Sequence, residues 1–350
     1  MQAIVIGAGQ AGLSVGYHLA KRGVSSVILE ARARVGDVWR DRWDSLRLFT
    51  PARFNGLAGM PFPADGRIFP TKDEMADYLE RYAERFELRV YRGVAVDRVS
   101  RVGERYIVAA KHARFEAEHV VVAMANHQRP YVPAIASQLD AGILQLHSSE
   151  YRNPTPLRSG GVLVVGAGNS GAEIAVEVAR AGHTTWLSGR DMGQLPFRPS
   201  GRVGQVCMNW VMLRIALHRL RKLATKGMPL VRAQPRDLAA AGVERVPKTV
   251  AVSGGLPVME DGRRLDVANV VWCTGFESGL SWVDLPVFGE NSEPMHCRGI
   301  VTTEPGLYFV GLSLIHGVDR DAAYVAETIA RRTGMRHVPS GSPALRSAWW

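Results

Sequence analysis

Residues 5–16 read VIGAGQAGLSVG, and residues 164–175 read VVGAGNSGAEIA. Each stretch joins an apolar run, three glycines spaced as GxGxxG, and the first residues of a helical pattern. In dinucleotide-binding folds the first glycine forms a tight turn, the second lets the backbone approach a pyrophosphate, and the third allows helix and strand to pack closely. The start of the helix offers free N–H groups to the phosphates. The chain of 350 residues therefore contains two predicted dinucleotide-binding motifs.

The first glycine motif ends in an acidic residue. An apolar strand is predicted at 3–6, a helix at 13–22 and a second strand at 27–29, which is the context that the glycines require. Glu30 stands 23 residues after the first glycine, where a carboxylate can accept hydrogen bonds from ribose hydroxyls. A motif of this kind at the start of a chain is where flavoproteins hold FAD. The residues expected to bind FAD here are Gly7, Gly9, Gly12 and Glu30.

The second glycine motif ends in a basic residue. It is predicted to consist of a strand at 162–165, a helix at 172–180 and a strand at 184–187. Arg190 then occupies the place of the acid, and a guanidinium pairs with the ribose 2′-phosphate that an acid would repel. This motif is therefore predicted to bind NADPH, with a solvated strand-end charge as the alternative for Arg190. The residues expected to bind NADPH are Gly166, Gly168, Gly171, Ser188 and Arg190.

The composition limits the other functions. The formal net charge of +10 suits anionic ligands such as pyrophosphates but indicates no specific nucleic acid, and weak contact with a membrane surface stays open. Cys207, Cys273 and Cys297 form no CxxC pair and no metal-ligand pair, so we expect no metal site. Sparse cysteines are typical of the reducing cytoplasm. With no signal peptide and no run of about 18 apolar residues, we expect a cytoplasmic location.

The pattern changes several times between the two motifs. Residues 71–88 predict an amphipathic helix with Thr71 as its N-cap. Residues 89–123 alternate in a way that predicts several antiparallel strands. Residues 128–156 contain four prolines and are interpreted as a loop-like crossing between domains.

The pattern after the second motif suggests that one domain is inserted into the other. We expect a strand at 306–311 and a final helix at 319–332 with Asp319 as its N-cap. A basic helix is predicted at 209–226; we expect it to be solvated on one face, and a membrane-surface contact or a cover for the substrate cleft is the alternative. The expected boundaries are 1–152 for the first segment of the FAD-binding domain, 153–262 for the NADPH-binding domain and 263–350 for the second segment of the FAD-binding domain.

With these features in place, the chain resembles the flavin-containing monooxygenases, and in particular the short bacterial CzcO-like branch of FAD- and NAD(P)-dependent oxidoreductases. The resemblance covers nearly the whole chain. It is carried by GAGQAG (7–12), GDVWRDRWDSLRLFTP (36–51), LHSSEYRNP (146–154), GAGNSGAEIA (166–175), VVWCTGF (270–276) and GLYFVGL (306–312). It implies an α/β fold with two Rossmann-like dinucleotide-binding domains in a glutathione-reductase-like architecture.

The resemblance also implies roles for further residues. Those expected beside FAD are Gln10, Gly36, Asp37, Trp39 and the stretch 46–51. Those expected beside the NADPH pyrophosphate are Asn169 and Ser170. His147 and Tyr151 match a linker signature that couples NADPH docking to the flavin, although an ordinary loop histidine is the alternative for His147. The N-terminus of the final helix is expected to face the flavin, where its dipole stabilises the anionic reduced ring.

The chain departs from the family pattern near the expected flavin. Ala141 and Ile143 replace two residues of the linker signature, and Met124 stands where a threonine is usual. The segment before His316 is shorter than we expect in relatives. The asparagine that many members place beside the reacting oxygen has no counterpart, and Pro51 stands in its region.

The resemblance implies a monooxygenase that uses FAD and NADPH. One oxygen from O2 would pass, through a flavin C4a-(hydro)peroxide, to a small soft nucleophile (an amine or a sulfide) or to a ketone. Because the cofactor carries the chemistry, no catalytic side chain is assigned. The alternatives are an NADPH-dependent flavin oxidase or reductase without oxygenation, a weakly active nucleotide-binding protein, and a disulfide reductase, which the absent CxxC disfavours. The expected partners are a small-molecule substrate and O2, and a homodimer stays open.

Overall fold

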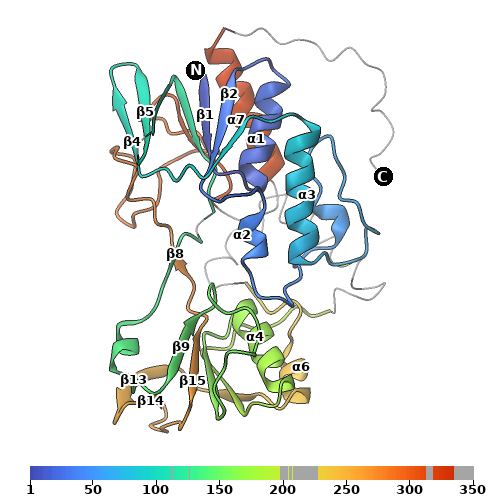
Figure 1. Cartoon of the computed structure of the whole chain (residues 1–350), viewed down its shortest axis with the longest axis vertical. Helices are drawn as coiled ribbons and strands as arrows, with labels where there is room; N and C mark the ends of the chain where they lie inside the picture. Colours follow the sequence, from blue (N-terminus) through green and yellow to red (C-terminus); the bar gives the residue numbers. More distant parts are fainter. Residues whose placement is uncertain are drawn as a thin grey trace.

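The computed structural model describes residues 1–111, 113–125, 127–197, 204, 207, 228–312 and 318–334. These residues form two α/β units that follow one another along the long axis of the molecule (Figure 1). The first unit contains the first glycine motif, and the second unit contains the second glycine motif.

The first unit is built on a parallel sheet of five strands. Their spatial order is β17 (Leu307–Phe309), β7 (His119–Val122), β1 (Ala3–Ile6), β2 (Ser26–Glu30) and β3 (Val90–Arg92). Successive side chains of a strand point to opposite faces, so Val5 packs against helices and Ile4 against a second, antiparallel sheet. Burial on both faces explains the uninterrupted apolar run at 3–6. The helices are α1 (Gln10–Ala20), α3 (Lys72–Arg85) and α7 (Val318–Arg332), and the antiparallel strands are β4 (Arg98–Val102), β5 (Arg105–Ala110) and β6 (Ala113–Ala117).

The second unit repeats this plan. Its parallel strands lie in the order β12 (Glu244–Val246), β11 (Thr185–Ser188), β10 (Val162–Val165), β15 (Asn269–Trp272) and β9 (Leu144–His147). Val164 packs toward the helices, whereas Leu163 packs toward a hairpin on the other face. The elements on these two faces are the helices α4 (Asn169–Arg180) and α6 (Pro235–Ala240), and the hairpin β13 (Thr249–Ser253) and β14 (Leu256–Met259) with the 3-10 helix η2 (Ala134–Gln138).

The sheet pairing places the domain boundaries elsewhere than the sequence suggested at 152/153 and 262/263. β9 and β15 pair with one another inside the second sheet, so the second unit begins before residue 144 and extends past residue 272. The chain crosses between the units at β8 (Arg129–Pro130) and β16 (Phe276–Glu277), which pair antiparallel. The strand at 144–147 is absent from the sequence prediction because it is an edge strand of mixed polarity, with three of its four residues only partly buried. The return of β17 to the first sheet agrees with the expected insertion.

The predicted start of the helix at 71–88 agrees with the structure. α3 begins after Thr71, whose hydroxyl accepts from the N–H of Glu74 at 3.1 Å while the Glu74 carboxylate accepts from the N–H of Thr71 at 2.7 Å. Asp319, however, is not the N-cap of the final helix, because α7 already begins at Val318. The basic helix predicted at 209–226 and the short segment before His316 lie outside the described residues. Within the described ranges, no helix is long and apolar enough to cross a membrane.

Candidate active site and cofactor-binding motifs

The three glycines of the first motif differ in backbone conformation and in the space around them. Gly7 has a φ of +100°, which L side chains rarely adopt. A Cβ on Gly12 would lie 1.8 Å from the carbonyl oxygen of Gly7, so the packing of α1 itself requires a glycine there. Among the described residues, a Cβ on Gly9 would meet no atom within 4 Å. Packing against the described residues therefore does not require a glycine at residue 9, and the open space beside it fits a ligand that approaches the backbone.

The rest of the first motif completes an anion- and ribose-binding arrangement. Gly9 is the N-cap of α1, and no side chain caps the first turn, which leaves backbone N–H groups for a phosphate. The carboxylate of Glu30 accepts from the N–H of Ala8 at 2.8 Å and from the N–H of Arg32 at 2.9 Å. These bonds hold Glu30 beside the glycine turn, where the ribose of a dinucleotide would lie. The residues present therefore fit FAD.

The second motif has the same backbone geometry. Gly166 has a φ of +110°, and a Cβ on Gly171 would lie 1.8 Å from the carbonyl oxygen of Gly166. A Cβ on Gly168 would again meet no atom of the described part of the chain within 4 Å. Gly168 is the N-cap of α4, whose first turn also lacks a side-chain cap. The second motif therefore fits a second dinucleotide.

Two side chains expected to bind NADPH are already used by the protein. The Asn169 amide donates to the carbonyl of Pro229 at 3.1 Å and accepts from the N–H of Val231 at 2.9 Å. The buried Ser188 hydroxyl donates to the carbonyl of Pro247 at 2.9 Å and accepts from the N–H of Thr249 at 2.9 Å. Both residues keep their place in the motif, but their side chains hold neighbouring segments rather than point freely at a nucleotide.

The basic end of the second motif contains a second arginine, Arg245, which no local sequence pattern indicates. Arg190 is exposed, and in the described part of the chain its guanidinium has no carboxylate partner. Arg245 donates to the carbonyls of Gly189 and Arg190 at 3.2 and 3.4 Å, and its buried Nε has no partner. Arg245 was overlooked because only the pairing of β12 with β11 brings it opposite Leu187, at the end of the strand that leads to Arg190.

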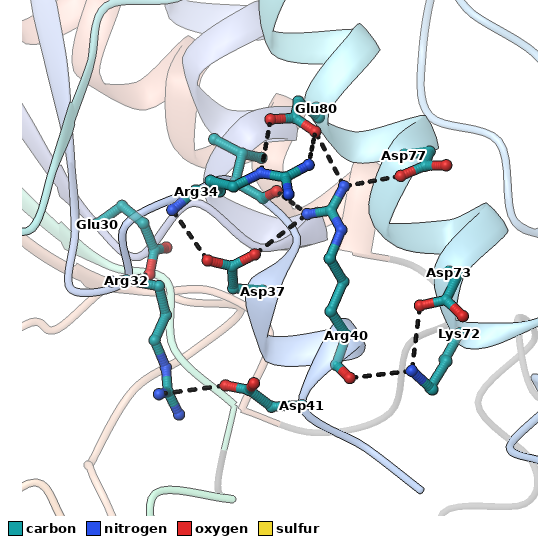
Figure 2. Close-up of polar contacts among 11 residues, drawn as sticks. Glu30, Arg32, Arg34, Asp37, Arg40, Asp41, Lys72, Asp73, Asp77 and Glu80 are labelled. Atoms are coloured by element: carbon teal, nitrogen blue, oxygen red, sulfur yellow. Dashed lines mark hydrogen bonds and ion pairs between the residues drawn. The ribbon is translucent and has the colours of Figure 1, made fainter. Parts of the chain in front are cut away.

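A network of charges fixes α2 (Asp37–Arg40), the helix expected along FAD, against α3 (Figure 2). Arg40 pairs with Asp37 at 3.2 Å, with Asp77 at 2.7 Å and with Glu80 at 2.9 Å. Gly36 has a φ of +87°, and a Cβ there would lie 2.6 Å from the carbonyl oxygen of Ala76 in α3. Gly36 and Asp37 thus have structural tasks of their own, and they position α2 for any role at the cofactor.

Trp39 of α2 connects the two units, and the linker residues His147 and Tyr151 bond elements of the second unit. Trp39 packs against the hydrophobic cores of both units. His147 donates from Nε2 to the carbonyl of Gly275 at 3.0 Å, and its Nδ1 accepts from the N–H of Ser149 at 3.1 Å. This arrangement suits the neutral ring, and burial lowers the pKa of His147. The fully buried Tyr151 donates to Glu177 of α4 at 3.2 Å.

Two acidic residues of α4 lie in this junction, and the sequence reading assigned them no role. Burial raises the pKa of Glu173 to about 7, although Arg232 lies 3.6 Å away and opposes the shift. Arg232 also donates to the carbonyl of Arg47 at 3.0 Å, in the stretch expected at the flavin face. Glu173 Oε1 and the indole nitrogen of Trp43 are buried without a hydrogen-bond partner. The helix that would hold NADPH is therefore bonded to the linker, and Arg232 bonds it to the segment after α2.

The cysteines do not form a redox pair. All three are free, and burial raises the pKa of Cys273 to about 12, so its thiol stays protonated. No group of His, Cys, Asp and Glu residues suited to a metal occurs in the described part of the chain. The two nucleotide motifs and the linker between them define a two-domain dinucleotide-dependent oxidoreductase.

Comparison with known proteins identifies its family. A model of the pyridine nucleotide-disulphide oxidoreductases matches residues 4–311, and the chain belongs to this family. An uncharacterized CzcO-like oxidoreductase from Geobacillus kaustophilus (strain HTA426) is 38% identical, over 93% of this chain and 97% of that protein. The uncharacterized oxidoreductase CzcO from Bacillus subtilis (strain 168) is 31% identical over the same shares. The predicted resemblance is confirmed.

Solved structures agree with this assignment. The flavin-containing monooxygenase from Stenotrophomonas maltophilia matches with a TM-score of 0.79 and 29% identity, over 95% of this chain and 98% of that chain. The bacillithiol disulfide reductase from Staphylococcus aureus, at 14% identity and a TM-score of 0.71, shares the fold. The chain is thus an oxidoreductase of the flavin monooxygenase type, with FAD and NADPH as its cofactors and the predicted α/β architecture.

Proposed function

We propose that this enzyme uses NADPH and O2 to insert one oxygen atom into a small soft nucleophile, such as an amine or a sulfide, or into a ketone. The observation that carries the proposal is the pair of glycine motifs, each with open space beside its middle glycine among the described residues. The linker between the motifs bonds α4 of the second unit through Tyr151 and Asp44 of the first unit through Asn153. Two dinucleotide sites in one chain suit hydride transfer from NADPH to a flavin. The indole-3-pyruvate monooxygenase YUCCA4 from Oryza sativa subsp. japonica, 26% identical over 94% of this chain and 87% of that protein, supports a ketone-bearing substrate.

The residues of this chain would bind and orient the two cofactors and shield the reaction site. The first-turn N–H groups of α1 would hold the FAD phosphates and Glu30 its ribose, while the start of α4 and Arg190 would hold NADPH. When bound, FAD supplies the hydride acceptance and the reaction with O2. His147 and Tyr151 would couple NADPH docking to the flavin side, because Tyr151 bonds α4 and the next two linker residues, Arg152 and Asn153, bond Asp44 of the first unit.

A second function, an NADPH-dependent flavin oxidase or reductase without oxygenation, is favoured by one observation. Asn55 is the asparagine nearest in the sequence to residues 46–51, the stretch expected at the flavin face, and its side chain is buried. Its amide donates to the carbonyls of Thr50 and Pro51 at 2.9 and 3.1 Å, and its oxygen accepts from the Thr50 hydroxyl at 2.5 Å. The Asn55 amide already makes these hydrogen bonds within a turn, so it is not free to stabilise a reacting oxygen.

The experiment that separates the two functions uses FAD-loaded protein reduced with NADPH in the absence of air. After O2 is admitted, the flavin spectrum and the released hydrogen peroxide are recorded together. A slow return to the oxidised spectrum with little peroxide, accelerated by a sulfide or ketone that becomes oxygenated, supports the monooxygenase. Immediate reoxidation with stoichiometric peroxide contradicts it and supports the oxidase.

A further inference from the structure

Arg42 lies in the junction between the two units. It follows α2 of the first unit, and its guanidinium carbon lies 5.6 Å from the ring centroid of Phe276 in β16. The rings of His147 and His127 lie 4.9 and 5.3 Å from the same phenyl ring, both edge-on. A partly buried cation therefore stands over a group of aromatic and imidazole rings, one of which comes from the second unit.

The carboxylate next to Arg42 in the sequence, that of Asp41, does not pair with the Arg42 guanidinium. The neighbouring Asp41 pairs instead with Arg32 at 3.2 Å and with Arg152 at 4.0 Å. Within the described residues, no ion pair or hydrogen bond joins the Arg42 guanidinium to a carboxylate. Burial, together with the charges of Arg152 and Arg32, lowers the pKa of Arg42 against the opposing charge of Asp41, although a guanidinium keeps its charge at neutral pH. A partly buried cation without a direct carboxylate partner gains from an anion that a ligand supplies.

The surrounding rings do not supply that anion. Both ring nitrogens of His147 bond the protein, and burial followed by the charge of Arg42 lowers the pKa of His127. The proposed cofactor contacts already provide for the phosphates of FAD and NADPH at the starts of α1 and α4 and at Arg190. One fixed cation beside neutral rings suits a carboxylate attached to an apolar body.

We propose that Arg42 binds the carboxylate of the substrate, so that this enzyme oxygenates small organic acids bearing a sulfide or a ketone. The inference rests on the proposed monooxygenase function and narrows its substrate class. It makes Arg42 a specificity-determining residue at the junction between the two units.

The test compares matched pairs of probes that differ by a carboxylate. The pairs are 3-(methylthio)propanoate with ethyl methyl sulfide, and phenylpyruvate with phenylacetone. For FAD-loaded wild-type protein we expect kcat/KM for oxygenated product to be at least about tenfold higher with the acid of a productive pair. Arg42→Gln should abolish this preference by lowering kcat/KM for the acid far more than for the neutral probe, and Arg42→Lys should retain part of the preference. Arg98→Gln, which removes an exposed arginine paired with Asp284, is the control of equal charge.

Independent readouts keep the outcome interpretable. FAD content and melting temperature show whether each variant folds and holds its cofactor. Titration of tryptophan fluorescence with each probe measures binding without turnover, since Trp39 and Trp43 lie near Arg42 in the sequence. Weaker binding of the acids alone in Arg42→Gln supports the proposal.

Two results overturn the proposal. If Arg42→Gln weakens NADP⁺ binding and affects acid and neutral probes equally, the anion at Arg42 is a phosphate of NADPH. If acid and neutral probes bind equally to wild type and variant, Arg42 binds no substrate anion. If the wild type oxygenates no probe and releases only peroxide, the proposed function fails; the fluorescence titration then still decides whether Arg42 binds a carboxylate.

Discussion

The two glycine motifs have the same backbone geometry, but different contacts hold the helix of each motif in place. Ser14 of α1 and Glu173 of α4 occupy the same position, seven residues after the first glycine of each motif, and His18 and Glu177 follow four residues later. In the first unit, Ser14 and His18 bond the same carboxylate oxygen of Asp319, at 2.6 and 3.1 Å. Helix α1 is therefore anchored to α7 within its own unit.

Helix α4 is anchored outside its own sheet. Glu173 pairs with Arg232, which reaches the backbone of Arg47 in the first unit, and Glu177 accepts from Tyr151 of the linker. A helix held inside its own unit suits a cofactor that stays bound. A helix held by the linker and the other unit suits a cofactor whose binding and release must affect the other unit. We therefore expect FAD to remain bound through turnover and NADPH affinity to depend on the linker.

The largest expected effect comes from filling the space beside each middle glycine. Gly9→Val should give a folded protein without FAD, because the added Cβ meets no atom of the described residues, whereas the new side chain blocks the pyrophosphate. Gly168→Val should keep its FAD and lose reduction by NADPH. Flavin absorbance and anaerobic reduction with NADPH measure both. A yellow Gly9→Val protein would mean that the first motif does not hold FAD.

Gly12→Val is the matched control for these variants. Its Cβ would lie 1.8 Å from the carbonyl oxygen of Gly7, so it should lower the melting temperature as well as the FAD content. If Gly9→Val destabilises the protein as much as Gly12→Val, its loss of FAD reflects misfolding instead of a blocked site.

The buried acid of α4 predicts a stability that depends on pH. Burial raises the pKa of Glu173 from an ordinary 4.5 to about 7, so the folded state keeps a proton that the unfolded state loses. Stability should therefore fall as the pH rises from about 4.5 to about 7. Glu173→Gln should remove this fall and stabilise the protein at pH 8 by up to about 3 kcal/mol. Denaturant unfolding at several pH values measures it, with the exposed Glu104→Gln as control.

The basic end of the second motif should set coenzyme preference. Arg190→Ala should raise KM for NADPH about 10- to 150-fold more than KM for NADH, because a charge-assisted phosphate contact is worth about 1.5–3 kcal/mol. Steady-state kinetics with both coenzymes measure the ratio. Arg180→Ala, at the far end of α4, is the control, and an unchanged ratio in Arg190→Ala would return that residue to a solvated charge.

The smallest expected effect is at Asp319, and its pH dependence is opposite to that of Glu173. Burial alone would raise the pKa of Asp319, but hydrogen bonds from His18 and Ser14 outweigh it and hold the pKa below its usual 3.8. The carboxylate therefore adds stability above that pH and loses it on acidification. Because the side chain is 41% exposed, Asp319→Asn should cost only about 1 kcal/mol at pH 7. Thermal unfolding should show this difference at pH 7 and none in strong acid; a constant difference would contradict the assignment.

The sequence predicted the elements that depend on local patterns. The strands at 3–6 and 162–165 have the expected bounds, because an apolar run ends at a glycine, and Thr71 caps its helix as its side chain suggests. The edge strand at 144–147 and the domain boundaries were beyond reach, because pairing partners distant in sequence define them. Arg245 lacked any local signal for the same reason.

The pairing of β8 with β16 has a consequence for the modular construction of the chain. Arg129 lies opposite Glu277 and Pro130 opposite Phe276, so the chain leaves the first unit and returns to it at adjacent points. Everything from residue 131 to residue 275 is thus a segment whose two ends are neighbours. Such a segment can be exchanged for another with equally close ends without moving the strands of the first sheet. The proposed NADPH site is therefore carried on a segment that could be exchanged as one unit.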